Sequence, residues 1–177
     1  MALKLEDKKR IVEEVHALAE GAYSIVAAEY RGLTVEQMTN LRRQAREANV
    51  VVRVVKNTLA RRALQGTQFE DMGEHLIGPL VLIISMEDPG SAARIVKAFR
   101  KEVQALEPKV LSIGNGAMSG DQLDAVASLP TYDEALSKLM YVMKAPVEKL
   151  ARTLNEVPGK LVRTVAAIKD VKEKEAA

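Results

Sequence analysis

A short pattern recurs three times in the last third of the chain, at a constant step. Each copy has a lysine, a leucine, three variable positions and an apolar residue, and the copies begin at Lys138, Lys149 and Lys160. Eleven residues, the length of each step, are close to three turns of an α-helix, so every copy presents the same side of the helix. The repeat therefore predicts a long helix with one apolar edge, made of Leu136, Leu139, Met143, Val147, Leu150, Leu154, Leu161, Val165 and Ile168.

This apolar edge needs a partner, because no further domain follows it in the sequence. The repetition favours one kind of partner bound more than once, with an amphipathic helix lying in each partner's groove. The predicted anchors are Leu139 with Met143, Leu150 with Leu154, and Leu161 with Val165. Two other interpretations fit the same spacing: a homomeric coiled coil, and a bent helix that folds back onto the rest of the chain.

Two prolines, Pro146 and Pro158, interrupt the repeat. A proline inside a helix costs about 3 kcal/mol and kinks it, although the first turn tolerates one. We therefore expect three short helical segments joined by kinks. Thr131, with Glu134 three positions later, predicts a capping box at the start of the tail. The expected organisation is a globular domain over residues 1–129 and a helical tail over residues 130–177.

Composition limits what the chain can be. Apolar residues make up 47% of it but aromatic residues only 3%, so the core must be built from Val, Ile, Leu, Ala and Met. The chain has no cysteine, which excludes disulfides and thiol catalysis. It also has no apolar run of membrane-spanning length and no signal-peptide pattern at the start, so we expect a soluble, cytoplasmic protein.

Strand-like and helix-like segments alternate through the expected globular domain. Strands are predicted at 22–29, 50–55, 80–85 and 109–113, with helices at 5–20, 34–48, 57–66, 88–105 and 119–127. Thr34 and Gln37 form a capping box, and Asn57 or Thr58 is the expected cap of the third helix. The alternation predicts an α/β (α+β) two-layer sandwich of four strands, and it leaves both antiparallel and mixed sheets open.

One segment carries most of the positive charge. Between residues 31 and 66, eight basic residues stand against Glu36 and Glu47, a net charge of +6. Such a field attracts polyanions, above all nucleic acid. No aromatic residue lies among the basic ones, so backbone and shape recognition of folded RNA is favoured over base stacking. The candidate RNA-binding residues are Arg31, Arg42, Arg43, Arg46, Arg53, Lys56, Asn57, Thr58, Arg61 and Arg62.

Patterns typical of enzymes are missing from the sequence. His16 and His75 have no cysteine or serine nucleophile in a known motif, and no glycine-rich loop has nucleotide-binding spacing. No metal-ligand cluster is visible either. We therefore expect no catalytic residue, no metal and no cofactor.

Several strings of the sequence resemble one protein family. They are Tyr30–Val35 (YRGLTV), Leu41–Glu47 (LRRQARE), Val52–Leu59 (VRVVKNTL), Gly78-Pro79, Leu129–Tyr132 (LPTY) and Gly159–Thr164 (GKLVRT). Together they resemble the bacterial large-subunit ribosomal protein at the base of the lateral stalk, the tenth of the L series. The resemblance covers essentially the whole chain.

The resemblance implies a ferredoxin-like N-terminal domain that binds large-subunit ribosomal RNA beside the eleventh L protein. It implies a C-terminal helix that carries dimers of the acidic stalk protein, which recruit translational GTPases. It also implies binding to the protein's own messenger RNA leader as translational autoregulation, and a ribosome-bound location. Many relatives carry two Lys-Leu units and this chain has three, with Pro146–Val157 resembling an inserted unit, so the resemblance leaves two or three dimers open and the repeat itself favours three.

Overall fold

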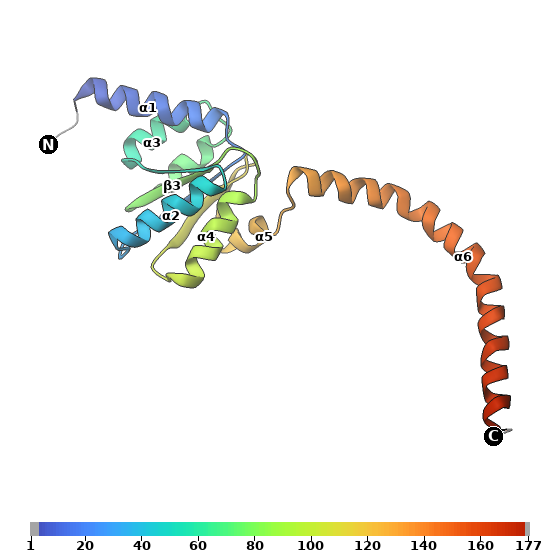
Figure 1. Cartoon of the computed structure of the whole chain (residues 1–177). Coiled ribbons are helices and arrows are strands. Elements are labelled where there is room, and N and C mark those ends of the chain that lie inside the picture. Colours follow the sequence, from blue (N-terminus) through green and yellow to red (C-terminus); the bar gives the residue numbers. More distant parts are fainter. Residues whose placement is uncertain (1–3, 176–177) are drawn as a thin grey trace. The chain divides into compact units, whose positions relative to one another are not determined.

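The computed structural model describes residues 4–175 of the chain. The chain divides into two compact units, residues 1–131 and residues 132–177 (Figure 1). This division falls two residues after the expected domain boundary. The division into units does not test the predicted RNA binding of the first segment or the predicted partner binding of the second.

The first unit is built on a five-stranded sheet in which all neighbouring strands are antiparallel. The strands run in the order β2-β3-β1-β4-β5, so β2 forms one edge. Their bounds are β1 (Ser24–Glu29), β2 (Val50–Val54), β3 (Leu80–Ser85), β4 (Glu107–Ser112) and β5 (Ala117–Ser119). The four predicted strands are confirmed. The fifth, β5, was not predicted, because so short a strand shows no pattern.

Helices cover both faces of this sheet (Figure 1). One face carries α2 (Val35–Glu47), α4 (Ser91–Glu102) and, after the short 3-10 turn η2 (Gly120–Gln122), α5 (Leu123–Ala127). The other carries α1 (Leu5–Glu20), α3 (Asn57–Leu64) and the 3-10 turn η1 (Glu70–His75). Successive residues of β1 alternate between the two cores, as strand side chains must.

The path of the chain confirms the predicted α/β class. The run β1-α2-β2-β3-α4-β4, with its four strands in the order β2-β3-β1-β4, is the ferredoxin-like arrangement with both helices on one face. The predicted two-layer sandwich describes the sheet together with α2 and α4 on one of its faces. Here α1, α3 and η1 add a helical layer on the opposite face. The alternation could not show this, because it does not tell on which face a helix packs.

Local hydrogen bonds explain where the helices begin. The predicted capping box at α2 is present: the Gln37 backbone N–H donates to Thr34 Oγ1 at 3.2 Å, and the Thr34 N–H donates to Gln37 Oε1 at 2.9 Å. The predicted cap of α3 is wrong. The helix begins at Asn57, and Lys56 takes the N-cap position without a side-chain hydrogen bond, since the Asn57 side chain bonds elsewhere.

The end of the first unit is fastened to α4. Arg94 Nη2 donates to the Leu129 carbonyl oxygen at 2.7 Å. Gly90, in the N-cap position of α4, lies beside this bond, where a Cβ atom would come within 3.2 Å of both the Leu129 and Val126 oxygens. The connection that leads to the tail is therefore held in place as far as Leu129.

The second unit is one helix, α6 (Tyr132–Glu175), with Pro146 and Pro158 in its interior. It is bent near residue 157 (Figure 1). The predicted long kinked helix is confirmed, but the predicted division into three segments is wrong, because the helix continues through both prolines. A proline removes one hydrogen bond of the ladder, and the neighbouring bonds on either side keep the helix together.

Candidate nucleic-acid and partner interfaces

The arginines of α2 lie on different sides of the helix. The helix buries Leu41 and Ala45 against the sheet, so Arg42 and Arg46, each one position further on, fall on the flank beside them. Both are exposed and line the same groove. Arg43 is outside this groove, and its Nη2 donates to Asn40 Oδ1 at 2.9 Å. The predicted α2 cluster is thus one pair plus a separate arginine.

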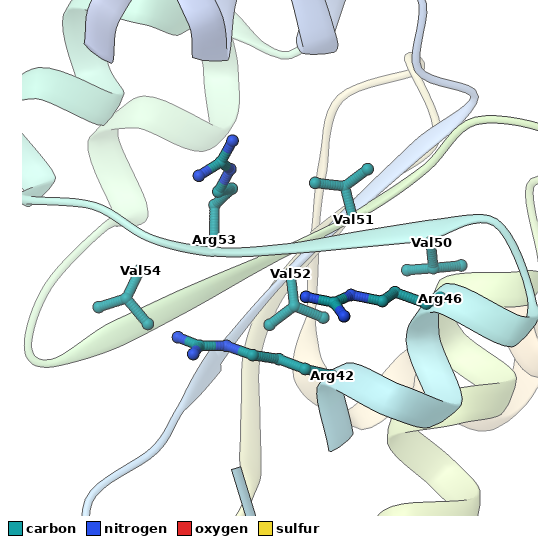
Figure 2. Close-up of a pocket in the computed structure, with 7 residues that line it drawn as sticks. All are labelled: Arg42, Arg46, Val50, Val51, Val52, Arg53 and Val54. Atoms are coloured by element: carbon teal, nitrogen blue, oxygen red, sulfur yellow. The ribbon is translucent and has the colours of Figure 1, made fainter. Parts of the chain in front are cut away.

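The groove lined by Arg42 and Arg46 runs along the edge strand β2. It has a volume of about 500 Å³ and is also lined by Arg53 and the valines of β2. Figure 2 shows Arg42 and Arg46 reaching toward β2 from one side, while Arg53 points away on the other. There Arg53 Nη2 lies 3.8 Å from Glu14 Oε2 of α1. The groove was not predicted, because the sequence does not show which strand is an edge.

Two of the predicted RNA-binding residues hold the fold together. Arg61 donates from Nε to the Gly73 carbonyl oxygen and from Nη2 to the Leu76 carbonyl oxygen, both at 2.9 Å. Asn57 Nδ2 donates to the Gly78 carbonyl oxygen at 2.8 Å. These bonds connect α3 to η1 and to the loop before β3. The neighbouring Lys56, Thr58 and Arg62 are exposed.

Arg31 follows β1 and does not line the β2 groove. Its Nε lies 4.0 Å from Glu29 Oε1. Glu29 is also 3.6 Å from the Lys109 amino group, and the Glu107 and Glu29 carboxylates together raise the pKa of Lys109. Arg31 therefore stands in a mixed-charge neighbourhood, unlike Arg42 and Arg46.

The six predicted partner anchors are all exposed on α6. Their exposed fractions lie between 57% and 73% for Leu139, Met143, Leu150, Leu154, Leu161 and Val165. Val147 and Ile168 of the same edge are exposed as well. The first copy differs from the other two, since Tyr141 and Val142 stand where the later copies have an arginine and a threonine. Burial of such an edge would contribute about 25 cal/mol per Å² of apolar surface.

A second groove lies at the bend of α6. It has a volume of about 770 Å³ and is lined by Arg152, Asn155, Glu156, Pro158, Gly159, Val162 and Arg163. Arg163 Nε donates to the Gly159 carbonyl oxygen at 3.2 Å across one turn of the helix. The sequence predicted a kink here but not this hollow, which the anchors of the apolar edge do not line.

His16 takes part in the packing of the first unit. His16 Nδ1 lies 2.8 Å from the Ala63 carbonyl oxygen and so links α1 to α3. Within residues 4–175, no group of three or more His, Cys, Asp or Glu side chains could hold a metal ion. In the same range, no helix has both the length and the apolar content to cross a membrane.

Comparison with known proteins gives consistent matches along the chain. The family model described as "Ribosomal protein L10" matches residues 3–101, and the model described as "Ribosomal protein uL10 C-terminal region" matches residues 129–157. A protein of Thioalkalivibrio sulfidiphilus named "Large ribosomal subunit protein uL10" is 61% identical over 99% of this chain and 100% of its own length.

Two further relatives have the same name. The protein of Hydrogenovibrio crunogenus is 60% identical over the full length of both chains. That of Psychrobacter is 60% identical over 98% of this chain and 99% of its own. The segment Pro146–Val157, which resembled an insertion, lies inside the region matched by the C-terminal family model.

Proposed function

The chain belongs to the ribosomal protein L10 family and is a structural constituent of the large ribosomal subunit, and we propose that it joins ribosomal RNA to a set of acidic stalk proteins. In this proposal the first unit binds large-subunit ribosomal RNA through its basic surface. The helix α6 anchors dimers of the acidic stalk protein, which recruit translational GTPases.

The observation that carries the proposal is the exposed apolar edge of α6, which repeats from Lys138 to Lys149 to Lys160 at a constant step. Eleven residues of helix are about 16 Å long at 1.5 Å per residue. This is enough for a small helical dimer at each copy if the bend separates neighbours. Each copy supplies two anchors one turn apart, which is the pattern of a helix lying in a hydrophobic groove.

Three copies support three dimers. Leu139 and Met143 would anchor the first, Leu150 and Leu154 the second, and Leu161 and Val165 the third. Native mass spectrometry of the chain co-expressed with the acidic stalk protein tests this number. We expect six acidic chains on each copy of this protein. Four acidic chains would mean that one of the three copies binds no dimer. The complete absence of acidic chains from the complex would overturn the stalk proposal itself.

A deletion sharpens the count. Removing Lys149–Gly159 takes out one complete step of the repeat, so the remaining anchors keep their side of the helix. The complex should then hold four acidic chains. A full-length variant with Leu150→Ala and Leu154→Ala should also hold four, while Asn155→Ala, outside the edge, should still hold six. An unchanged count in both shortened and substituted chains would contradict the assignment of sites.

A homomeric coiled coil is the alternative use of the same edge. Light scattering on the purified chain, alone and mixed with the acidic stalk protein, separates the two. The coiled coil predicts a dimer whose mass is unaffected by the acidic protein. The stalk proposal predicts that the acidic protein forms a complex with a single copy of this chain.

The basic surface of the first unit supports the RNA part of the proposal. Lys56, Thr58 and Arg62 are exposed and free to contact phosphates, whereas Arg61 is engaged in the fold. Binding to the protein's own messenger RNA leader would use the same surface, and the eleventh L protein is proposed as its neighbour. A gel-shift competition between ribosomal RNA and leader RNA tests whether one surface binds both.

A further inference from the structure

We propose that the groove along the free edge of β2 is a binding track for the ribose-phosphate backbone of RNA. Arg42 and Arg46 would bind phosphates on one side of the strand, and Arg53 on the other. This inference rests on the proposed RNA binding of the first unit and specifies where one RNA strand lies. The proposed RNA-binding surface then includes the exposed edge of β2 as well as basic side chains.

The spacing of the arginines follows the direction of the strand. Arg42 and Arg46 are four residues apart, about 6 Å along the helix axis at 1.5 Å per residue. Figure 2 shows Arg46 beside the Val50 end of β2 and Arg42 toward the Val54 end. After Val54 the chain continues through Val55 to the exposed Lys56. The positive charges therefore form a line along β2 rather than a point.

The guanidinium groups in the groove are available to a ligand. Within the described part of the chain, neither Arg42 nor Arg46 forms an ion pair with a carboxylate, while Arg53 has only the 3.8 Å contact with Glu14 and is 54% exposed. Arginine presents several N–H donors in a planar fork that matches phosphate oxygens. Three such groups around one groove, with a single carboxylate nearby, favour a polyanion.

The backbone of β2 offers further donors. Among the strands of residues 4–175, β2 pairs with β3 alone, because it stands at the end of the sheet order. Its outer edge therefore carries N–H groups without a strand partner, and phosphate oxygens can accept hydrogen bonds from backbone N–H groups. Val54 is 44% exposed at this edge.

An acidic peptide added as a sixth strand is the other ligand that such an edge could take. Added strands obtain specificity from pockets for alternate side chains. Here arginines flank β2 on both faces, and the apolar part of the described lining consists of valines of β2 itself, so no apolar residue of a second element completes a pocket for a peptide side chain. A chain with evenly spaced negative charges and no side chain to bury fits this surface better.

Filter binding of the full chain to a transcript of the stalk-base segment of ribosomal RNA, across a salt series, tests the proposal. The variant with Arg42→Ala and Arg46→Ala should lower the log–log salt slope by about 1.4 to 1.8, since each lost phosphate contact contributes about 0.7 to 0.9. Arg100→Ala removes an exposed arginine of α4 that does not line the groove, and this control variant should leave the slope unchanged. The variant with Arg42→Lys and Arg46→Lys should retain most of the slope.

Three results would overturn the track. The first is an unchanged slope in a double alanine variant with the circular dichroism spectrum of the wild type. The second is an equal loss from Arg100→Ala. The third is a polyglutamate peptide that binds the wild type and not the double variant, while RNA binding is the same for both. If the wild-type chain itself shows no salt-dependent RNA binding, the proposed RNA function fails first, and with it the track.

Discussion

In the described part of the first unit most large apolar side chains lie between a sheet and two layers of helices, whereas in α6 they lie mostly on the surface of one helix. Phe69 and Phe99 are each 1% exposed, one in each core of the first unit. Leu150 and Leu154 are more than 60% exposed. The same type of residue thus stabilises the fold in one unit and is exposed in the other, where we propose that a partner covers it.

The two units also differ in how they use arginine. Arg61 of the first unit donates to two backbone carbonyls and belongs to the fold. Arg42 and Arg46 are exposed beside a groove, and Arg152 and Arg163 of α6 line a different one. Position in the structure therefore separates exposed arginines that line a groove from arginines that bond to the fold, where residue type alone does not.

Cutting the chain between the units should give the largest effect. Residues 1–131 should unfold cooperatively and retain RNA binding. Residues 132–177 should be mostly unstructured alone, because their apolar edge is uncovered and each interior proline costs about 3 kcal/mol. Circular dichroism of the two fragments measures this, and adding the acidic stalk protein should restore the helix. A strongly helical, monomeric tail without partner would remove the contrast between the units.

Truncation of one apolar residue in each unit should give very different losses of stability. Phe99→Ala should lower the free energy of unfolding by about 3 to 5 kcal/mol, because it leaves a cavity in the α4 core. Leu150→Ala should change it by less than about 0.5 kcal/mol, as expected for an exposed position. Urea unfolding followed by circular dichroism measures both. A comparable loss from Leu150→Ala would show that α6 is covered within the chain.

Replacing the neighbouring residues Arg61 and Arg62 one at a time should affect stability differently, with smaller changes than those expected for Phe99→Ala. Arg61→Ala should lower the free energy of unfolding by about 1 to 3 kcal/mol, since it removes the Arg61 donor from the Leu76 oxygen and leaves the Gly73 oxygen with only the Leu76 N–H. Arg62→Ala should leave stability within about 0.5 kcal/mol of the wild type. Thermal unfolding of the two variants compares them. Equal melting temperatures would mean that the Arg61 hydrogen bonds do not stabilise the α3–η1 packing.

The smallest expected effect concerns an ion pair at the surface of the first unit. Lys97 Nζ lies 2.8 Å from Asp124 Oδ1, and this hydrogen bond lowers the pKa of the Asp124 carboxyl, with smaller contributions from Arg100 and Lys101. The pair therefore adds stability above the ordinary aspartate pKa, and this is lost as the pH falls through the lower native value. Lys97→Met should move the pKa back up, as an NMR titration would show, and Arg100→Ala should move it less.

Local patterns in the sequence predicted those parts of the fold that depend on neighbouring residues. The capping box of Thr34 and Gln37 is a contact between near neighbours in the chain, and the four longer strands have their own apolar runs. The cap of α3 was missed because the Asn57 side chain bonds to Gly78, which is distant in sequence. The second helical layer was missed for a similar reason, since face assignment depends on contacts between distant segments.

The candidate sites show the same limit. The anchors of α6 follow from the period of one helix, and each of them is exposed as the repeat predicts. The basic cluster mixed residues of two kinds, because only the fold shows that Arg61 reaches the η1 carbonyls while Arg42 faces an edge strand. The β2 groove has no signature in sequence, as its walls come from a helix and a strand whose pairing is set by the sheet order.

The edge position of β2 also bears on how the protein behaves when no ligand is present. An uncovered strand in which every residue but Arg53 is a valine is a template for pairing with the same strand of another copy. Arg42, Arg46 and Arg53 place positive charge on both sides of it, so two such edges repel each other. The side chains proposed to attract RNA thus also oppose aggregation. Variants that lose these charges should precipitate at lower protein concentrations, and lysine in the same positions should preserve solubility.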